Sequence, residues 1–184
     1  SDNVWQSWIA ANRAFDEEKL AKLSPLSEGT AAAWAIPPSL EPDAVMNYYW
    51  GAKGDSVPTG GYPLFIYMHG SGPRSQEWAT GLVLASRFDD APSAYFIPQI
   101  PNEGEYYRWW HKSKQYAWEK LLRQSLASGE IDPDRVYVFG ISEGAYGSQR
   151  LACFYADYIA GAGPMAGGEP LKNAPAENLR NTAF

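Results

Sequence analysis

The chain has 184 residues, 45% of them hydrophobic and 20% charged, which is the composition of one globular domain and excludes a disordered chain. The formal net charge of −6 argues against nucleic acid as the main partner, because binding phosphates requires a positive face. Cys153 is the sole cysteine, so an internal disulfide is excluded. With only two histidines beside it, no metal site is expected.

Residues 1–61 predict an N-terminal helix followed by the leading strands of a sheet. Apolar residues recur at helical spacing over residues 4–23, and Pro25 lies just beyond, so we expect an amphipathic helix that ends there. Apolar runs at residues 31–36 and 45–50 predict two strands, and a turn containing prolines separates them. A short turn between two strands favours an antiparallel pair.

From residue 62 onward, apolar strands alternate with segments that can form helices. Strands are predicted over residues 64–68, 94–97, 136–139 and 158–163, and helices over residues 77–86, 106–126 and 145–158. The strand runs are continuously apolar, as is typical of strands buried on both faces of a parallel sheet. We therefore predict an α/β fold with a mostly parallel, doubly wound sheet, whose ligands bind beyond the carboxyl ends of the strands.

The most informative motif is Gly140-Ile141-Ser142-Glu143-Gly144, a G-x-S-x-G pentapeptide directly after the predicted strand at residues 136–139. A serine on a sharp turn between a strand and a helix is held above the sheet, where its hydroxyl can attack a carbonyl carbon. The glycines two positions before and after it leave room for the tight backbone. The motif lies in the strand–turn–helix context that this chemistry requires.

At this point the chain resembles the serine-esterase branch of the α/β-hydrolase fold, over about residues 62–170. The motifs that carry the resemblance are Tyr67-Met68-His69-Gly70-Ser71-Gly72 and the stretch from Val138 through the pentapeptide to Gly147. Three further runs narrow the resemblance to one group of these esterases: Ile97-Pro98-Gln99-Ile100-Pro101, Trp109-Trp110 and Ile131-Asp132-Pro133-Asp134-Arg135-Val136. They look like the secreted bacterial esterase and predicted peptidase group, which is related to polyhydroxybutyrate depolymerases and feruloyl or acetylxylan esterases.

The resemblance implies a serine hydrolase that cleaves carboxylic esters without a metal or an organic cofactor. Its substrate would be a small-molecule or polysaccharide-linked ester, and its location secreted or periplasmic. By position, Ser142 would be the nucleophile, and the amides of Glu143 and Ser71 would form the oxyanion hole. His69 and Gly70 would belong to the oxyanion loop, with His69 bracing that loop rather than acting as a base. Possible substrate-pocket residues are Trp109, Trp110, Asn102 and Glu169.

The chain departs from the resemblance in one respect, because no histidine follows Ser142. In this fold the acid and the histidine come after the serine in chain order. We therefore expect residues 1–184 to be a single α/β-hydrolase domain that lacks its last strands, with residues 62–184 as the first part of the catalytic core. A missing C-terminal part would supply Asp and His. A non-standard pair of Ser142 with His111, a serine peptidase on the same fold, and a catalytically silent relative that binds carbohydrate or a partner are the alternatives.

Overall fold

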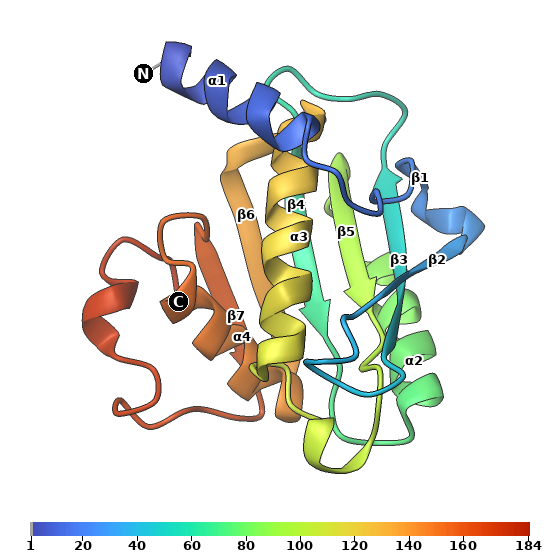
Figure 1. The fold of residues 1–184 in the computed structure, drawn as a ribbon, viewed down its shortest axis with the longest axis vertical. Coiled ribbons are helices and arrows are strands. Elements are labelled where there is room, and N and C mark those ends of the chain that lie inside the picture. The colour runs from blue at the N-terminus through green and yellow to red at the C-terminus, as the bar shows by residue number, and fades with distance from the viewer. Residues whose placement is uncertain (1) are drawn as a thin grey trace.

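The computed structural model describes residues 2–184 as one central sheet with helices on both faces (Figure 1). Its helices are α1 (Asp2–Arg13), α2 (Arg74–Arg87), α3 (Lys112–Ser128) and α4 (Glu143–Phe154), with short 3₁₀ helices at Leu26–Glu28, Gly104–Tyr106 and Ala176–Leu179. Its strands are β1 (Ser24–Pro25), β2 (Ala31–Ala35), β3 (Val45–Lys53), β4 (Tyr62–Met68), β5 (Ser93–Pro98), β6 (Ile131–Ile141) and β7 (Gly161–Met165).

The sheet is mixed at its leading edge and parallel elsewhere. The strand order is β1-β3-β5-β4-β6-β7, and β2 pairs with β3 off this path. Strands β2 and β3 are antiparallel to each other, as are β3 and β5, whereas β5, β4, β6 and β7 run parallel. The prediction of a mostly parallel α/β sheet with an antiparallel pair in front is therefore confirmed. The carboxyl ends of the four parallel strands meet at one edge.

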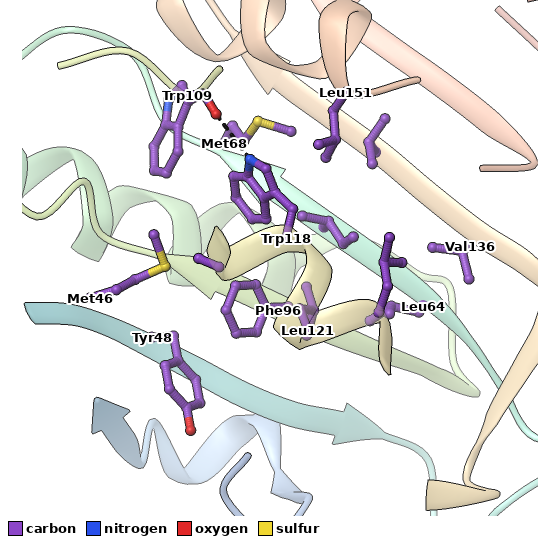
Figure 2. Close-up of a cluster of buried hydrophobic side chains, with 14 of the residues drawn as sticks. Met46, Tyr48, Leu64, Met68, Phe96, Trp109, Trp118, Leu121, Val136 and Leu151 are labelled. Carbon is purple, nitrogen blue, oxygen red and sulfur yellow. Dashed lines mark hydrogen bonds between the residues drawn. The ribbon is translucent and has the colours of Figure 1, made fainter. Parts of the chain in front are cut away.

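One face of the sheet carries the main core, which lies under α3 and α4. Figure 2 shows this core, in which Phe96 of β5 packs among Tyr48 and Trp118, and the indole of Trp118 donates a hydrogen bond of 2.9 Å to the Trp109 carbonyl. Burying a side chain of this size stabilises a fold by about 1.5–3 kcal/mol. The core therefore fixes β4, β5 and α3 against one another.

The opposite face is covered by α2 beside β4 and β5, where Tyr67, Tyr95 and Ile97 are buried. Next to this contact an apolar hollow of about 340 Å³ opens over β6 and β7. Its lining includes Tyr137, Phe139 and Phe184. Just outside β7, Ala183 makes an isolated parallel bridge to Gly161. Within residues 2–184, no helix combines the length and the apolar character that crossing a bilayer requires.

The N-terminal helix prediction is wrong beyond residue 13, where α1 ends. Residues 14–23 instead run along α3, because partners far away in the sequence hold them there. Arg123 forms a 2.8 Å ion pair with Glu17, and the Gln124 side chain bonds to the carbonyl of Glu18 and the amide of Leu20. These tertiary contacts outweigh the weak local helix preference.

Other boundaries also differ from the predictions, and α4 ends at Phe154 rather than at residue 158. The helix predicted from residue 106 begins at Lys112, because the His111 side chain caps it by accepting a hydrogen bond from the Ser113 amide. The last strand covers residues 161–165 rather than 158–163, because the amide of Ile159 still bonds to Tyr155 at the end of α4. Residues 132–135 lie within β6 but bulge from it, since Tyr62 pairs with Ile131 and Leu64 with Val136.

Candidate active site

Ser142 lies on the turn between β6 and α4, at the carboxyl edge of the sheet. Its backbone has φ 53° and ψ −114°, a conformation that residues other than glycine rarely adopt. The amide of Ser142 donates to the carbonyl of Met165 at 2.9 Å, and its carbonyl accepts from the Ala145 amide at 2.9 Å. The side chain is exposed. The turn therefore raises the Ser142 hydroxyl above the sheet.

The two glycines of the pentapeptide are required by close backbone contacts. A Cβ on Gly140 would lie 2.3 Å from the Gly144 carbonyl oxygen. A Cβ on Gly144 would lie 1.9 Å from the carbonyl oxygen of Met68 and 2.9 Å from that of His69. No side chain fits at such distances. Helix α4 therefore begins pressed against the end of β4 and the loop that follows it.

That loop, residues 69–72, is called the oxyanion loop after the role expected from the sequence, and His69 braces it from inside the core. The His69 ring is fully buried, and its Nε2 accepts a hydrogen bond of 3.1 Å from the Ile100 amide. Nδ1 therefore carries the proton of the neutral ring, and it donates to the carbonyl of Gly70 at 2.8 Å. Burial lowers the pKa of His69 from 6.5 to about 4, although the bond to Gly70 opposes this. The ring stays uncharged at neutral pH.

Two aromatic side chains complete this brace. The hydroxyl of Tyr107 donates to the carbonyls of Gly70 and Gly72, at 2.7 and 3.1 Å. The indole of Trp109 donates to the His69 carbonyl at 2.9 Å. Trp109 is only 1% exposed, so the structure places it in the core and not on the wall of a substrate pocket.

Glu143 directly follows Ser142 in the chain, and Ser71 directly follows Gly70, which approaches Ser142. Ser71 is exposed in the oxyanion loop, and Glu143 is the first residue of α4. Among residues 2–184, no group accepts a hydrogen bond from either amide. A Cβ built on Gly70 would lie 3.5 Å from the Cβ of Ser142, which shows how closely the loop approaches the serine.

The Glu143 side chain is half-buried and forms an ion pair with Arg108, at 3.4 Å between Nη1 and Oε1. The contact between Arg108 and Glu143 does not meet hydrogen-bond geometry. The Oε1 atom of Glu143 is therefore buried without a hydrogen-bond partner among residues 2–184. Burial raises the pKa of Glu143, and the charge of Arg108 partly opposes that rise. The sequence motifs did not predict the contact of Arg108 with Glu143, because this contact depends on the path of the loop between β5 and α3.

A groove of about 400 Å³ adjoins the oxyanion loop. One wall comes from the loop itself and the other from the segment before α3. Its lining residues are Ser71, Gly72, Pro73, Glu103, Gly104, Tyr107 and Arg108. Arg108, which lines this groove, also contacts Glu143, the residue that follows Ser142.

The other predicted pocket residues lie apart from this groove. Asn102 donates to the Glu41 carboxylate at 3.0 Å and to the Pro42 carbonyl at 3.1 Å, so it ties down the turn before β3. Trp110 lies beneath the guanidinium of Arg150, whose carbon is 4.1 Å from the ring centre. Arg150 also pairs with Glu169 at 2.6 Å. The structure therefore joins Trp110 and Glu169 through an arginine that the sequence did not single out.

A buried ion pair supports the segment that carries Tyr107, Arg108 and Trp109. Glu41 and Lys114 are both fully buried, with 2.6 Å between their charged atoms. Lys114 also donates to the Tyr106 carbonyl at 2.6 Å. Burial lowers the pKa of Lys114, and the contact with Glu41 opposes this. Nothing in the local pattern around Glu41 indicates that it is buried.

The Ser142 hydroxyl makes no hydrogen bond within residues 2–184, and neither histidine is bonded to it. Both ring nitrogens of His69 are occupied by the loop contacts. His111 caps α3, where its Nδ1 lies 2.9 Å from the Ser113 hydroxyl. In the same part of the chain, no three His, Cys, Asp or Glu side chains gather as metal ligands do.

No protein-family model matches the chain. Over 50 residues, or 27% of its length, the chain is 52% identical to poly(3-hydroxyalkanoate) depolymerase C of Paucimonas lemoignei, and the match covers 12% of that protein. A solved thermostable esterase superposes with a TM-score of 0.64 at 22% identity, covering 83% of this chain and 44% of that one. The fluorophosphonate-binding serine hydrolase FphF of Staphylococcus aureus gives a TM-score of 0.54 at 13% identity, covering 73% and 55%.

The chain thus spans 12% of the depolymerase and less than half of the thermostable esterase. The superpositions cover 83% and 73% of this chain, so the likeness is not confined to the turn at Ser142. Strand order, the turn at Ser142 and these superpositions together show that the chain has the α/β-hydrolase fold.

Proposed function

We propose that this protein is a serine hydrolase that cleaves carboxylic esters through an acyl intermediate on Ser142. The observation that carries the proposal is the positive φ of Ser142 at the strand–helix turn, together with its exposed hydroxyl. A non-glycine residue is held in such a conformation only where the surroundings impose it, and such positions cluster at active sites. The names of the two solved neighbours, an esterase and a serine hydrolase, support the same reaction class.

Attack on an ester carbonyl turns its oxygen into an oxyanion, which needs hydrogen-bond donors fixed in advance. We assign this role to the amides of Ser71 and Glu143. Both lie beside Ser142, and no acceptor within residues 2–184 uses them. Losing one such donor raises the barrier by roughly 3–4 kcal/mol. The brace of His69 and Tyr107 supports this assignment, because it holds the loop that presents the Ser71 amide.

The serine hydroxyl needs a general base, because a neutral hydroxyl is a weak nucleophile. Neither histidine of the chain is hydrogen-bonded to Ser142. Both ring nitrogens of His69 are engaged elsewhere, and Nδ1 of His111 contacts the Ser113 hydroxyl at the start of α3. We therefore propose that the acid and the histidine of the triad come from sequence beyond Phe184. The bridge between Ala183 and Gly161 supports this arrangement, since it lies where a further strand would continue the sheet.

The substrate class is proposed from the names of relatives alone. One is a poly(3-hydroxyalkanoate) depolymerase and another, with a TM-score of 0.51 at 13% identity, is a ferulic acid esterase. The first name refers to a polyester and the second to an ester of an aromatic acid. We therefore propose an uncharged ester of one of these two classes as the substrate. We also propose a secreted or periplasmic location, which rests on the family resemblance and is tested by fractionating cells of the native host.

The test uses the full-length gene product, a fluorophosphonate probe and p-nitrophenyl acetate. We expect probe labelling and ester cleavage in the wild type. Both should be lost in Ser142→Ala, with a fall of about 10⁴-fold or more in kcat/KM. Ser71→Ala serves as a control, because the proposed oxyanion donor there is the backbone amide. Mass spectrometry of the native protein reports whether its polypeptide continues beyond residue 184.

Two outcomes would contradict the proposal. Ester cleavage retained in Ser142→Ala would remove the nucleophile assignment. A folded full-length protein that neither reacts with the probe nor cleaves esters would favour the binding relative. A peptidase and an esterase would use the same serine turn, so the structure does not separate them. Assays with aminoacyl anilides beside the p-nitrophenyl ester do.

A further inference from the structure

The loop after β7, residues 166–173, lies against the turn that carries Ser142. The Met165 carbonyl at the end of β7 accepts the Ser142 amide at 2.9 Å. A Cβ built on Gly167 would lie 2.9 Å from the Ser142 carbonyl oxygen and 3.0 Å from the Cβ of Ala145. This loop, named here the β7 loop, is therefore in contact with the backbone of the nucleophile. A movement of the loop would change the position of the turn.

The β7 loop is attached to α4 through Glu169. The side chain of Gln149 accepts from the Glu169 amide at 2.8 Å, and Arg150 Nε lies 2.6 Å from Glu169 Oε1. The other carboxylate oxygen, Oε2, accepts from Asn173 at 2.8 Å. We call the set Gln149, Arg150, Glu169 and Asn173 the Glu169 anchor. Both oxygens of the carboxylate are used inside it.

Arg150 is itself held in place by Trp110. Its guanidinium lies over the indole at 4.1 Å, and the Trp110 carbonyl accepts from the Gln115 side chain at 2.8 Å. Stacking of this kind orients an arginine and leaves its N–H groups free to bind a carboxylate. The Glu169 side chain is 5% exposed and that of Arg150 19%. Burial favours protonation of Glu169, but the bonds from Arg150 and Asn173 outweigh it and lower its pKa.

We infer that Arg150 and Glu169 form a positioning pair for Ser142 and that Glu169 is not the acid of the triad. The pair acts through the β7 loop, in which Gly167 packs against the Ser142 carbonyl and which directly follows Met165, the acceptor of the Ser142 amide. A triad acid must offer an oxygen to the catalytic histidine. Each oxygen of Glu169 is already bonded, one to Arg150 and one to Asn173, and the side chain is 5% exposed, so little of the carboxylate is accessible to a histidine from elsewhere. This role for Arg150 and Glu169 rests on the proposed function, and it excludes Glu169 as the acid of the triad.

The kinetic test is Glu169→Gln in the full-length gene product, with p-nitrophenyl acetate. Glutamine has the size of glutamate but no charge. Its amide NH₂ group would face an N–H donor of Arg150 or Asn173, so one of the two hydrogen bonds would be lost. For a positioning residue we expect kcat to fall about three- to tenfold with KM within twofold of the wild type. A triad acid would lose about 10⁴-fold in kcat. A loss of that size, or an unchanged kcat, overturns the inference.

A double-mutant cycle with Arg150→Met checks that Glu169 acts through Arg150. In the Arg150→Met background, Glu169→Gln should cost less than twofold in kcat, because the partner is already absent. Equal costs in both backgrounds would contradict the pairing. Glu177→Gln is the matched control, since Glu177 is exposed in the 3₁₀ helix beyond the loop, and it should behave as the wild type.

A second readout does not depend on activity. Lys172 is exposed in the β7 loop, so trypsin cleavage after it reports how firmly the loop is docked. Glu169→Gln should speed this cleavage at least threefold, while Glu177→Gln should not. If cleavage speeds up but the wild type shows no ester hydrolysis, the proposed function fails and the anchor stands. If the wild type is active and cleavage after Lys172 is unchanged, the anchor fails alone.

Discussion

Two loops hold Ser142, and different interactions keep them in place. The oxyanion loop is braced from inside the core by uncharged groups, the His69 ring, the Tyr107 hydroxyl and the Trp109 indole. The β7 loop is attached near the surface by the ion pair of Arg150 and Glu169. Hydrogen bonds among buried neutral groups are insensitive to salt, whereas an ion pair whose arginine is 19% exposed is weakened by it to a limited extent.

The difference separates two tasks. In the proposed mechanism the oxyanion loop presents an amide at a fixed distance. Its brace cannot shift without disturbing the core around Trp109 and Trp118. The β7 loop has no such tie to the core, so the free energy that keeps it docked is smaller. We therefore expect changes at the oxyanion loop to cost more stability than changes at the β7 loop.

The largest effect is expected from Gly144→Ala, which drives a methyl group into the carbonyls of Met68 and His69. Such overpacking against backbone should lower the free energy of unfolding by about 3 kcal/mol. Urea unfolding of the variant measures it. Gly168→Ala is the matched control in the β7 loop, because a Cβ there meets only the Gln149 side chain at 3.9 Å. Similar losses in both variants would contradict the comparison.

The next effect is a pH dependence due to His69. Because its pKa is about 4 in the fold against 6.5 ordinarily, the unfolded chain takes up a proton first as the pH falls. Stability is therefore full above pH 6.5 and declines towards pH 4, by about 3 kcal/mol in all. Unfolding measured from pH 7 to 4 should be less steep in His69→Gln, which has no group that titrates in this range. Parallel curves would show that His69 does not contribute.

A smaller effect is expected from Tyr107→Phe, which removes the buried hydroxyl bonded to Gly70 and Gly72. Gly70 keeps its bond from His69, so only the Gly72 carbonyl loses its partner. We expect a loss of about 1–2 kcal/mol in the free energy of unfolding. Tyr106→Phe is the control, since its hydroxyl makes no hydrogen bond within residues 2–184, and it should be near neutral.

The smallest effect concerns Asn173→Ala in the Glu169 anchor. The variant loses one hydrogen bond at a half-exposed site, so the free energy of unfolding should fall by less than about 1 kcal/mol. Trypsin should nevertheless cut faster after Lys172. In 0.5 M salt the wild-type rate should rise towards that of the variant, because screening weakens the pair of Arg150 and Glu169. A salt-independent wild-type rate would mean that charge does not hold this loop.

The sheet was largely predictable because most of its strands coincide with continuous apolar runs in the sequence. Strands β4, β5 and β6 contain the runs at residues 64–68, 94–97 and 136–139, and each ends near the predicted edge. The N-terminal helix was not predictable in full, because residues 14–23 bind Arg123 and Gln124 of α3, more than a hundred residues away. Local periodicity contains no information about such partners.

For the site, the pentapeptide located the turn at Ser142, since steric crowding at Gly140 and Gly144 is a local requirement. The surrounding charges were not predictable. Arg108 reaches Glu143 and Arg150 reaches Glu169 only through the paths of two loops. Trp109 and Trp110 are adjacent in sequence, yet one is buried under the oxyanion loop and the other supports Arg150. Two neighbouring side chains on irregular backbone follow no periodic rule.

The positive φ at residue 142 belongs to the backbone and not to the serine, because Met165 and the crowded glycines impose it on any occupant. An alanine there inherits the strained angles, whereas glycine adopts them freely. Ser142→Gly should therefore resist urea better than Ser142→Ala by about 1 kcal/mol, although neither retains a nucleophile. A sequence optimised for thermal endurance alone would carry glycine at this position.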